Sequence, residues 1–416
     1  MSRVLQNTSF LLSAQVITKV ISFFYTLFLA KSLGVETFGL YTVALSYFSL
    51  ISAVSEFGIN RYLTREVALN RHLSSLLCGV LLFRLTFVSV VFAIFAVALS
   101  LLDSNASRVS LSVLAVSAVL PQAIAFTLDS IYVGLQKIKV SSIGLLSLNI
   151  STTIIGIWLI SAGNNVLGAV ATLILGQIIY VLTLLLFNLK NGWGQLKNSI
   201  HRERALTKAH MLKITKGSLP YGILGILGLV YFKIDSLMLG YMKGSFEVGL
   251  YGAAYRFLEA IVFVPSSVAT VLFPVLAKLH QSDPPAGGEV GRLYRKSLKA
   301  LFGVSILILI GYIFILPILI LSFLPQFAAS IPALRLLSLT IPFMFVHVPG
   351  AMVLLSTDKY LKPVIFLSVF TVLFNVIGNL IFIPQFGLMG ASYMTVVSEI
   401  LSFLVFFTFL QFKVLR

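Results

Sequence analysis

The chain has 416 residues, of which 58% are hydrophobic and only 10% are charged. Soluble domains carry roughly a quarter charged residues, so this composition excludes a soluble protein and predicts an integral membrane protein. The formal net charge of +17 is compatible with nucleic-acid binding by its size alone. The distribution of the basic residues along the chain indicates instead that this net charge sets the orientation of the protein in the membrane. The single cysteine, Cys78, excludes an intramolecular disulfide.

Apolar windows long enough to cross a hydrocarbon core of ~30 Å recur along the whole chain. The first window is too long and too lightly flanked by positive charge for a cleaved signal peptide, so we count it as a span. Six windows fall in each half and predict an all-α protein with twelve transmembrane helices. The windows cover residues 10–30, 38–58, 76–102, 108–133, 141–162 and 166–188, and then 218–241, 249–279, 299–323, 330–356, 361–383 and 388–412.

The start of the first half reappears 210 positions later, at about half the length of the chain. The repeated pieces are Leu27-Phe28-Leu29, Gly34, Gly39-Leu40-Tyr41 and Ala44, matched by Leu237-Met238-Leu239, Gly244, Gly249-Leu250-Tyr251 and Ala254. Many secondary transporters are built from such duplications and handle their substrate between the halves. We therefore expect two six-helix lobes, residues 1–188 and 218–416, joined by a basic cytoplasmic linker at 189–217.

Basic residues are distributed unevenly between the two sides of the predicted membrane. With the N-terminus inside, 21 Lys and Arg residues fall in cytoplasmic segments, and only Lys31, Arg108 and Lys243 fall in the opposite loops. The positive-inside rule then places both termini in the cytoplasm. The remaining role of this charge is attraction to anionic lipid headgroups, so we expect no nucleic-acid partner.

The sequence lacks the local motifs of several enzyme classes. It has no P-loop, its five histidines show no metal-ligand spacing, and no two of its thirteen acidic residues lie within five positions of each other. Carboxylates from different helices can still meet in a fold, so the spacing of the acidic residues alone does not exclude a catalytic pair. We predict a protein that is not an enzyme and that binds no metal and no cofactor.

Nine of the charged side chains inside predicted spans are candidates for a functional role. Each costs about 2.5–3.5 kcal/mol at the bilayer centre on insertion scales, so each is expected to face protein or water. Glu56, Arg84 and Asp129 lie near cytoplasmic ends, where snorkelling or a bridge to Arg61 or Lys137 would satisfy them. The deeper six are Lys19, Lys233, Asp235, Arg256, Glu259 and Glu399.

The deeper charges allow two interpretations. Lys233, Asp235 and Arg256 fall at one level of the seventh and eighth spans, and Arg256 shares a helix face with Glu259. An Asp235–Arg256 pair that ties the two helices together is one interpretation. The other is an anion-binding cavity, since Lys19 and Lys233 have no carboxylate within four residues on the same helix face.

From the second interpretation we predict an anionic substrate and a set of residues that bind it. The predicted substrate-binding residues are Lys19, Lys233, Arg256, Arg84 and Arg61. The candidates for ion coupling are Asp235, Glu259 and Glu399, because burial makes the protonation of a carboxylate sensitive to its surroundings.

Three blocks of sequence resemble the polysaccharide exporters of the multidrug/oligosaccharidyl-lipid/polysaccharide superfamily. The first half carries Gly34-Val35-Glu36-Thr37-Phe38-Gly39-Leu40-Tyr41 and Glu56-Phe57-Gly58-Ile59-Asn60-Arg61-Tyr62-Leu63-Thr64-Arg65-Glu66. The second half carries Asp235-Ser236-Leu237-Met238-Leu239-Gly240, Val248-Gly249-Leu250-Tyr251, Ala254-Tyr255-Arg256 and Leu272-Phe273-Pro274. The last two spans carry Ile383-Pro384-Gln385-Phe386-Gly387-Leu388-Met389-Gly390-Ala391 and Ser398-Glu399.

The resemblance implies an O-antigen-type flippase of the bacterial cytoplasmic (inner) membrane. Such a protein moves an undecaprenyl-pyrophosphate-linked oligosaccharide to the outer leaflet through a cationic cavity that opens alternately to each side. The implied partners are the lipid-linked oligosaccharide, anionic membrane lipids, a polysaccharide polymerase and a chain-length regulator. Two alternatives stay open: an ion-coupled drug or small-solute antiporter on the same scaffold, and a membrane glycosyltransferase or polymerase.

Overall fold

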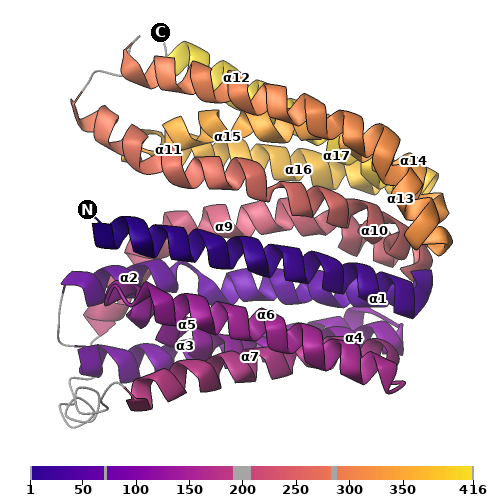
Figure 1. The fold of residues 1–416 in the computed structure, drawn as a ribbon, viewed down its shortest axis with the longest axis horizontal. Helices are drawn as coiled ribbons and strands as arrows, with labels where there is room; N and C mark the ends of the chain where they lie inside the picture. The colour runs from indigo at the N-terminus through magenta and orange to yellow at the C-terminus, as the bar shows by residue number, and fades with distance from the viewer. Residues whose placement is uncertain (1, 70–72, 191–207, 283–287, 415–416) are drawn as a thin grey trace. The chain divides into compact units, whose positions relative to one another are not determined.

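The computed structural model describes residues 2–69, 73–190, 208–282 and 288–414, and these are almost entirely helical (Figure 1). The first half contains α1 (Ser2–Glu56), α2 (Ile59–Leu69), α3 (Leu73–Leu102), α4 (Ala106–Ser117), α5 (Val119–Gly134), α6 (Ile138–Ser161) and α7 (Asn165–Lys190). The second half contains α9 (Lys208–Lys243), α10 (Ser245–Ile261), α11 (Phe263–Ser282), α12 (Glu289–Ile310), α13 (Leu316–Phe323), α14 (Ile331–Ser338), α15 (Ile341–Leu355), α16 (Leu361–Phe386) and α17 (Leu388–Lys413).

The twelve predicted spans are all found in the described part of the chain. Ten helical stretches are long and apolar enough to cross a membrane, and the bent pair of Pro325–Ser338 and Ile341–Leu355 adds one more. The stretch Ser13–Glu56 accounts for two spans, because it is kinked at Gly34. Gly34 has a φ of 74°, in the left-handed region that residues other than glycine rarely adopt. The fold is therefore that of an all-α membrane protein with two six-helix lobes.

The described residues divide into two compact units. One unit comprises residues within 1–33 and 40–229, and the other comprises residues 34–39 together with those within 230–416. In the first unit α6 packs along α7, and in the second α16 packs along α17 (Figure 1). Much of the predicted linker, 189–217, lies outside the described residues, so the predicted lobe boundaries stay a prediction.

The repeated glycines meet in the second unit. Gly244 repeats the left-handed conformation of Gly34, with a φ of 88°, and α10 begins at the next residue. A Cβ atom added to Gly39 would lie 1.8 Å from the carbonyl oxygen of Ser245, and one added to Gly249 would lie 2.0 Å from that of Val35. Only glycine allows two backbones to approach so closely. The duplicated segments thus form one close helix crossing, which we call the glycine crossing.

Prolines account for two interruptions of the spans in the second unit. The predicted eighth span is broken at Val262, between α10 and α11, three residues before Pro265. Proline lacks the N–H that would bond to the carbonyl of Ile261, and its ring crowds that turn. The tenth span bends by 42° between α14 and α15, where Pro342 occupies the first turn of α15. The span between α12 and α13 contains a π-helical turn at Gly311–Ile315.

Candidate functional site

One carboxylate is enclosed inside the second unit by neutral side chains. Asp235 on α9 is 2% exposed. Tyr251 on α10 donates a hydrogen bond to its Oδ2 atom over 3.0 Å, and Thr395 on α17 donates to the same atom over 2.7 Å. Asn379 on α16 donates to Oδ1 over 2.6 Å. Four helices converge on this carboxylate, and we call the four residues the acid cluster.

A chain of amides and hydroxyls extends the acid cluster along α16 and α17. Asn379 donates its second hydrogen to Oδ1 of Asn375 over 3.0 Å, and Asn375 donates to Ser398 over 3.3 Å. All three side chains are at most 1% exposed. The Oδ1 atom of Asn379 is buried and accepts no hydrogen bond from the described residues. The cluster therefore keeps an unused oxygen beside the carboxylate.

The acid cluster lacks a cation. Among the described residues, no Lys, Arg or His lies within 4 Å of the Asp235 carboxylate. Hydrogen bonds from neutral donors favour the ionised carboxylate, whereas an uncompensated buried charge is costly. Carboxylate, amide and hydroxyl oxygens are also the ligands that hard cations prefer. The arrangement therefore offers oxygen atoms of the kind that a proton or a small cation binds.

A second buried acid lies close to the cluster. Glu399 on α17 is 8% exposed and is one turn beyond Thr395. It interacts electrostatically with Asp235 and with Tyr231 of α9. Two carboxylates that interact in a buried setting do not readily carry a negative charge at the same time. Binding of a cation at one of them therefore affects the other.

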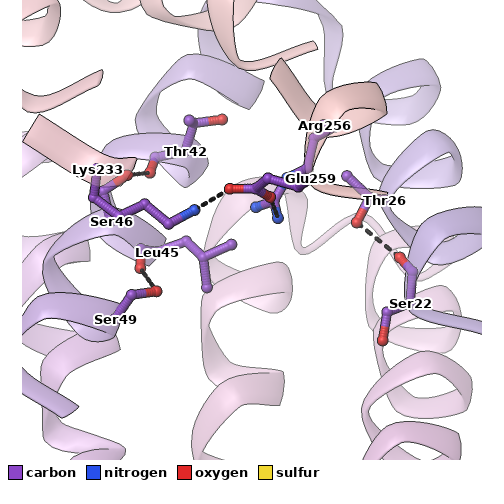
Figure 2. Close-up of polar contacts among 9 residues, drawn as sticks. All are labelled: Ser22, Thr26, Thr42, Leu45, Ser46, Ser49, Lys233, Arg256 and Glu259. Carbon is purple, nitrogen blue, oxygen red and sulfur yellow. Dashed lines mark hydrogen bonds and ion pairs between the residues drawn. The ribbon is translucent and has the colours of Figure 1, made fainter. Parts of the chain in front are cut away.

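Three charges form a separate group on α9 and α10. Lys233 of α9 and Arg256 of α10 both bind the carboxylate of Glu259, which lies between them (Figure 2). Lys233 bonds to Oε1, and the Arg256 Nη1 atom lies 2.6 Å from Oε2. The three side chains are 14%, 20% and 24% exposed for Lys233, Arg256 and Glu259 respectively. We call this group the charge triad.

The charge triad carries an excess of positive charge. Two cations share one carboxylate, so the three residues together have a formal charge of +1. A phosphate can replace the carboxylate as a partner of both cations, and an arginine fork binds it through two parallel hydrogen bonds. The two cations of the triad therefore suit an anionic partner.

The predicted site residues of the first half have different surroundings. Arg84 on α3 is 1% exposed and donates to Asn60 over 2.7 Å and to Thr127 over 3.2 Å. Lys19 on α1 is exposed and makes no ion pair with a described residue. The side chain of Arg61 lies outside the described residues. A substrate role for these three residues stays a prediction.

Two details of the sequence interpretation are corrected by these contacts. Arg256 pairs with Glu259 and not with Asp235, whose partners are neutral. Lys233 is not an unpaired cation, because its carboxylate partner comes from the neighbouring helix and not from its own. Lys233 and Glu259 are 26 positions apart, so no pattern within one helix indicates their contact.

The sequence interpretation also missed the neutral members of the acid cluster. Asn375 and Asn379 are four residues apart and share one face of α16. Amides are rare in apolar spans because unsatisfied polar groups are costly there, so this pair was a usable signal. Thr395 and Tyr251 gave no such signal, since a hydroxyl in a transmembrane helix can bond to its own backbone.

Comparison with protein families gives two matches. The model of the family described as polysaccharide biosynthesis protein matches residues 4–280. The MatE family model matches residues 220–381. An uncharacterized membrane protein of Methanocaldococcus jannaschii is 26% identical over 206 residues, which cover 44% of this chain and 37% of that protein. The matched region thus spans little more than a third of the length of that relative.

Solved structures with similar folds include a drug transporter and a lipid flippase. A multidrug resistance MATE family transporter of the MOP superfamily, in an inward-facing conformation, has a TM-score of 0.76. It is 14% identical, over 95% of this chain and 94% of that chain. The lipid II flippase MurJ, in an inward closed conformation, has a TM-score of 0.69 and is 15% identical, over 96% of this chain and 86% of that chain. At these identities the likeness shows a common fold.

Proposed function

The chain belongs to the polysaccharide biosynthesis protein family, and on this premise we propose that it is a flippase for an undecaprenyl-pyrophosphate-linked oligosaccharide. The observation that carries the proposal is the charge triad, in which Lys233 and Arg256 share Glu259. A pyrophosphate cannot cross hydrocarbon without compensation, while its prenyl tail can remain in lipid. The protein then has to supply cations to the headgroup alone.

The acid cluster supplies the direction of transport in this proposal. Asp235 binds a proton or a small cation such as Na⁺ from the side where that ion is abundant. Because Asp235 and Lys233 lie on the same helix, α9, a cation that enters or leaves the cluster changes the packing of the helix that carries the triad. Transport proceeds by alternating access, with the ion gradient or the membrane potential biasing the cycle.

The cellular setting follows from the same proposal. The flippase lies in the bacterial cytoplasmic membrane with both termini in the cytoplasm, as the charge asymmetry predicts. Its substrate comes from glycosyltransferases at the inner leaflet, and its product feeds a polymerase with a chain-length regulator, as in O-antigen and lipopolysaccharide assembly. Residue 105 lies in a loop that is predicted to be outside the cytoplasm. A reporter enzyme that works only outside the cytoplasm should therefore be active when it is fused after this residue.

A drug antiporter is the second candidate, because the MatE model matches residues 220–381. The acid cluster suits either function. The charge triad distinguishes them, since a group with an excess positive charge repels the lipophilic cations that many drug exporters carry. We therefore place the drug antiporter second.

The experiment that tests the proposal uses purified protein in liposomes. A fluorescent polyprenyl-pyrophosphate-linked oligosaccharide is incorporated in both leaflets, and an added quencher reports its movement, with a cationic dye as the competing substrate. We expect lipid movement that depends on an imposed ion gradient and no dye transport. Gradient-driven dye transport without lipid movement would identify an antiporter. Formation or cleavage of a glycosidic bond would identify an enzyme.

A further inference from the structure

A groove lies between α11 and α12, in a part of the second unit that the proposed site does not use. Its volume is about 360 Å³, and six of its eight lining side chains are apolar. Val264 and Val268 form the α11 wall, and Leu301 and Val304 are among the apolar residues of the α12 wall. Lys296 is the one charged side chain in the lining.

The groove has the polarity of a single-chain lipid with a charged end. Lys296 and Val304 are eight residues apart, which is about 12 Å along the axis of a helix. The lysine side chain is exposed and makes no ion pair with a described residue. Arg292, which is also exposed, lies one turn before it. Lys296 therefore brings a positive charge to a lining that is apolar except for Ser297.

The α11 wall directly follows, along the chain, the helix α10 that carries two residues of the charge triad. Only Val262 separates α10 from α11. Glu259 is five residues before Val264, which corresponds to about 7.5 Å along the helix axis. A lipid in this groove thus contacts the helix that follows the one with Arg256 and Glu259. That proximity along the chain favours the transported lipid over a bystander as the occupant.

We propose that this groove binds the first isoprenoid units of the transported lipid, with its phosphate against Lys296, before the phosphate reaches the charge triad. The inference rests on the proposed flippase function. One groove between two helices accommodates one hydrocarbon chain, as a polyprenyl phosphate has, whereas a membrane phospholipid has two. Lys296 attracts the phosphate at the cytoplasmic face predicted for the start of α12.

The test is photo-crosslinking to the full chain in phosphatidylcholine nanodiscs. The probe is a short-chain polyprenyl diphosphate with a diazirine on its first isoprenoid unit, and labelled peptides are mapped by mass spectrometry. We expect labelling of α11 and α12 that excess undecaprenyl pyrophosphate removes and phosphatidylglycerol does not. Ala300→Trp fills the groove and should abolish this labelling, and Lys296→Gln should reduce it about fivefold.

Matched variants control for effects on folding. Phe302→Trp and Lys299→Gln change exposed positions of the same helix that do not line the groove, and both should label as the unchanged protein does. Equal competition by phosphatidylglycerol would assign the groove to phospholipid and overturn the proposal. Unchanged labelling in both Ala300→Trp and Lys296→Gln would overturn it as well.

The experiments can contradict the groove proposal and the flippase proposal independently of each other. Arg256→Gln should keep the groove labelling while transport in liposomes falls. If the unchanged protein transports lipid-linked oligosaccharide but α11 and α12 are not labelled, the groove proposal is wrong and the function stands. If the groove is labelled selectively but no polyprenyl-linked sugar is transported, the flippase function is wrong.

Discussion

Lys233 and Asp235 are two residues apart on α9, yet the structure gives them opposite surroundings. Asp235 is enclosed and accepts hydrogen bonds from neutral groups only. Lys233 is partly exposed and shares one carboxylate with Arg256. Residues at i and i+2 point to different sides of a helix. One helix therefore presents a buried carboxylate on one side and an ion-paired cation on the other.

The difference between the acid cluster and the charge triad lies in what each lacks. The acid cluster has a carboxylate without a cation, and the triad has a cation in excess of its carboxylate. Each deficit predicts the ligand that would complete the group, a small cation for the first and a phosphate for the second. Variants that alter one deficit at a time separate the two roles.

The largest effect is expected from Asp235→Asn, which removes the charge of the acid cluster and keeps its shape. Export of surface polysaccharide should fall about 100-fold, the order expected when a charged hydrogen-bond partner is lost. Protein abundance should fall much less than export, because an asparagine still accepts from Tyr251 and Thr395 and loses only the hydrogen bond from Asn379. Export in a strain that lacks its own flippase, with abundance measured on the same membranes, checks this.

The acid cluster is also the place to identify the coupling ion. Liposome transport measured with and without Na⁺ at fixed pH, and then across pH without Na⁺, separates the two ions. Full gradient-driven transport by Asp235→Asn would remove this residue from the coupling scheme. Asp103→Asn, in a loop of the other unit, serves as the matched control.

An intermediate effect is expected from the cations of the charge triad. Lys233→Gln and Arg256→Gln should each reduce export about tenfold, because each removes one charge-assisted bond of ~1.5 kcal/mol to the phosphate. Arg256→Lys should restore export only in part, since a point charge replaces a two-pronged donor. Lys19→Gln tests the predicted role of the first-half lysine in the same assay.

The triad also has a purely structural interpretation, which the exchange of two charges tests. If Arg256 and Glu259 only hold α10 together, the single variants Arg256→Glu and Glu259→Arg should lower abundance, and their combination should restore both abundance and export. If the triad binds the substrate, the combined variant should restore abundance alone. Normal export from both cation-to-glutamine variants would end the argument for an anionic substrate.

A smaller effect on transport, through folding, is expected at the glycine crossing. α10 begins there and carries both Tyr251 of the acid cluster and Arg256 of the triad, so the crossing positions both groups. Gly39→Ala and Gly249→Ala would bring a methyl group within 2.0 Å of a backbone carbonyl oxygen. Such overpacking costs about 1–3 kcal/mol of stability. Both variants should therefore have a lower midpoint of thermal unfolding, and less of each protein should accumulate in the membrane.

Gly303→Ala is the matched control for the crossing, since nothing lies within 4 Å of its added methyl group. It should leave the unfolding midpoint unchanged or raise it, because alanine favours a helix over glycine. Equal behaviour of all three variants would show that the close approach at the crossing tolerates a side chain.

The sequence predicts the spans better than it predicts the two charged groups. Spans follow from runs of apolar residues, whereas the close approach of the repeated glycines is seen only in the structure. The Arg256–Glu259 pair follows from helix periodicity, because its members are three residues apart. Thr395 and Asn379 reach Asp235 from helices at least 144 positions away, and no local pattern encodes which spans become neighbours.

The smallest effect is expected at a loop that belongs to neither group. Asp103 precedes α4 and pairs with Arg108, whose Nη2 atom lies 2.6 Å from the carboxylate. The Arg108 hydrogen bonds hold the pKa of Asp103 below its ordinary value, and a bond from the backbone N–H of Asn105 acts in the same direction. The pair links the loop to the first turn of α4.

A lowered pKa in the folded state fixes the sign of the pH dependence. The carboxylate stabilises the fold above the pKa of an unfolded Asp, about 3.9, and this stabilisation is lost as the pH falls through the lower folded value. Asp103→Asn should therefore lower stability by about 1 kcal/mol at pH 7 and by progressively less below pH ~4. Thermal unfolding of both proteins in detergent at pH 7, 5 and 3.5, at one scan rate, measures this difference. Export at pH 7 should not change, because neither residue belongs to the acid cluster or the charge triad. A stability difference that grows toward low pH would mean that the carboxylate of Asp103 is not held ionised by Arg108.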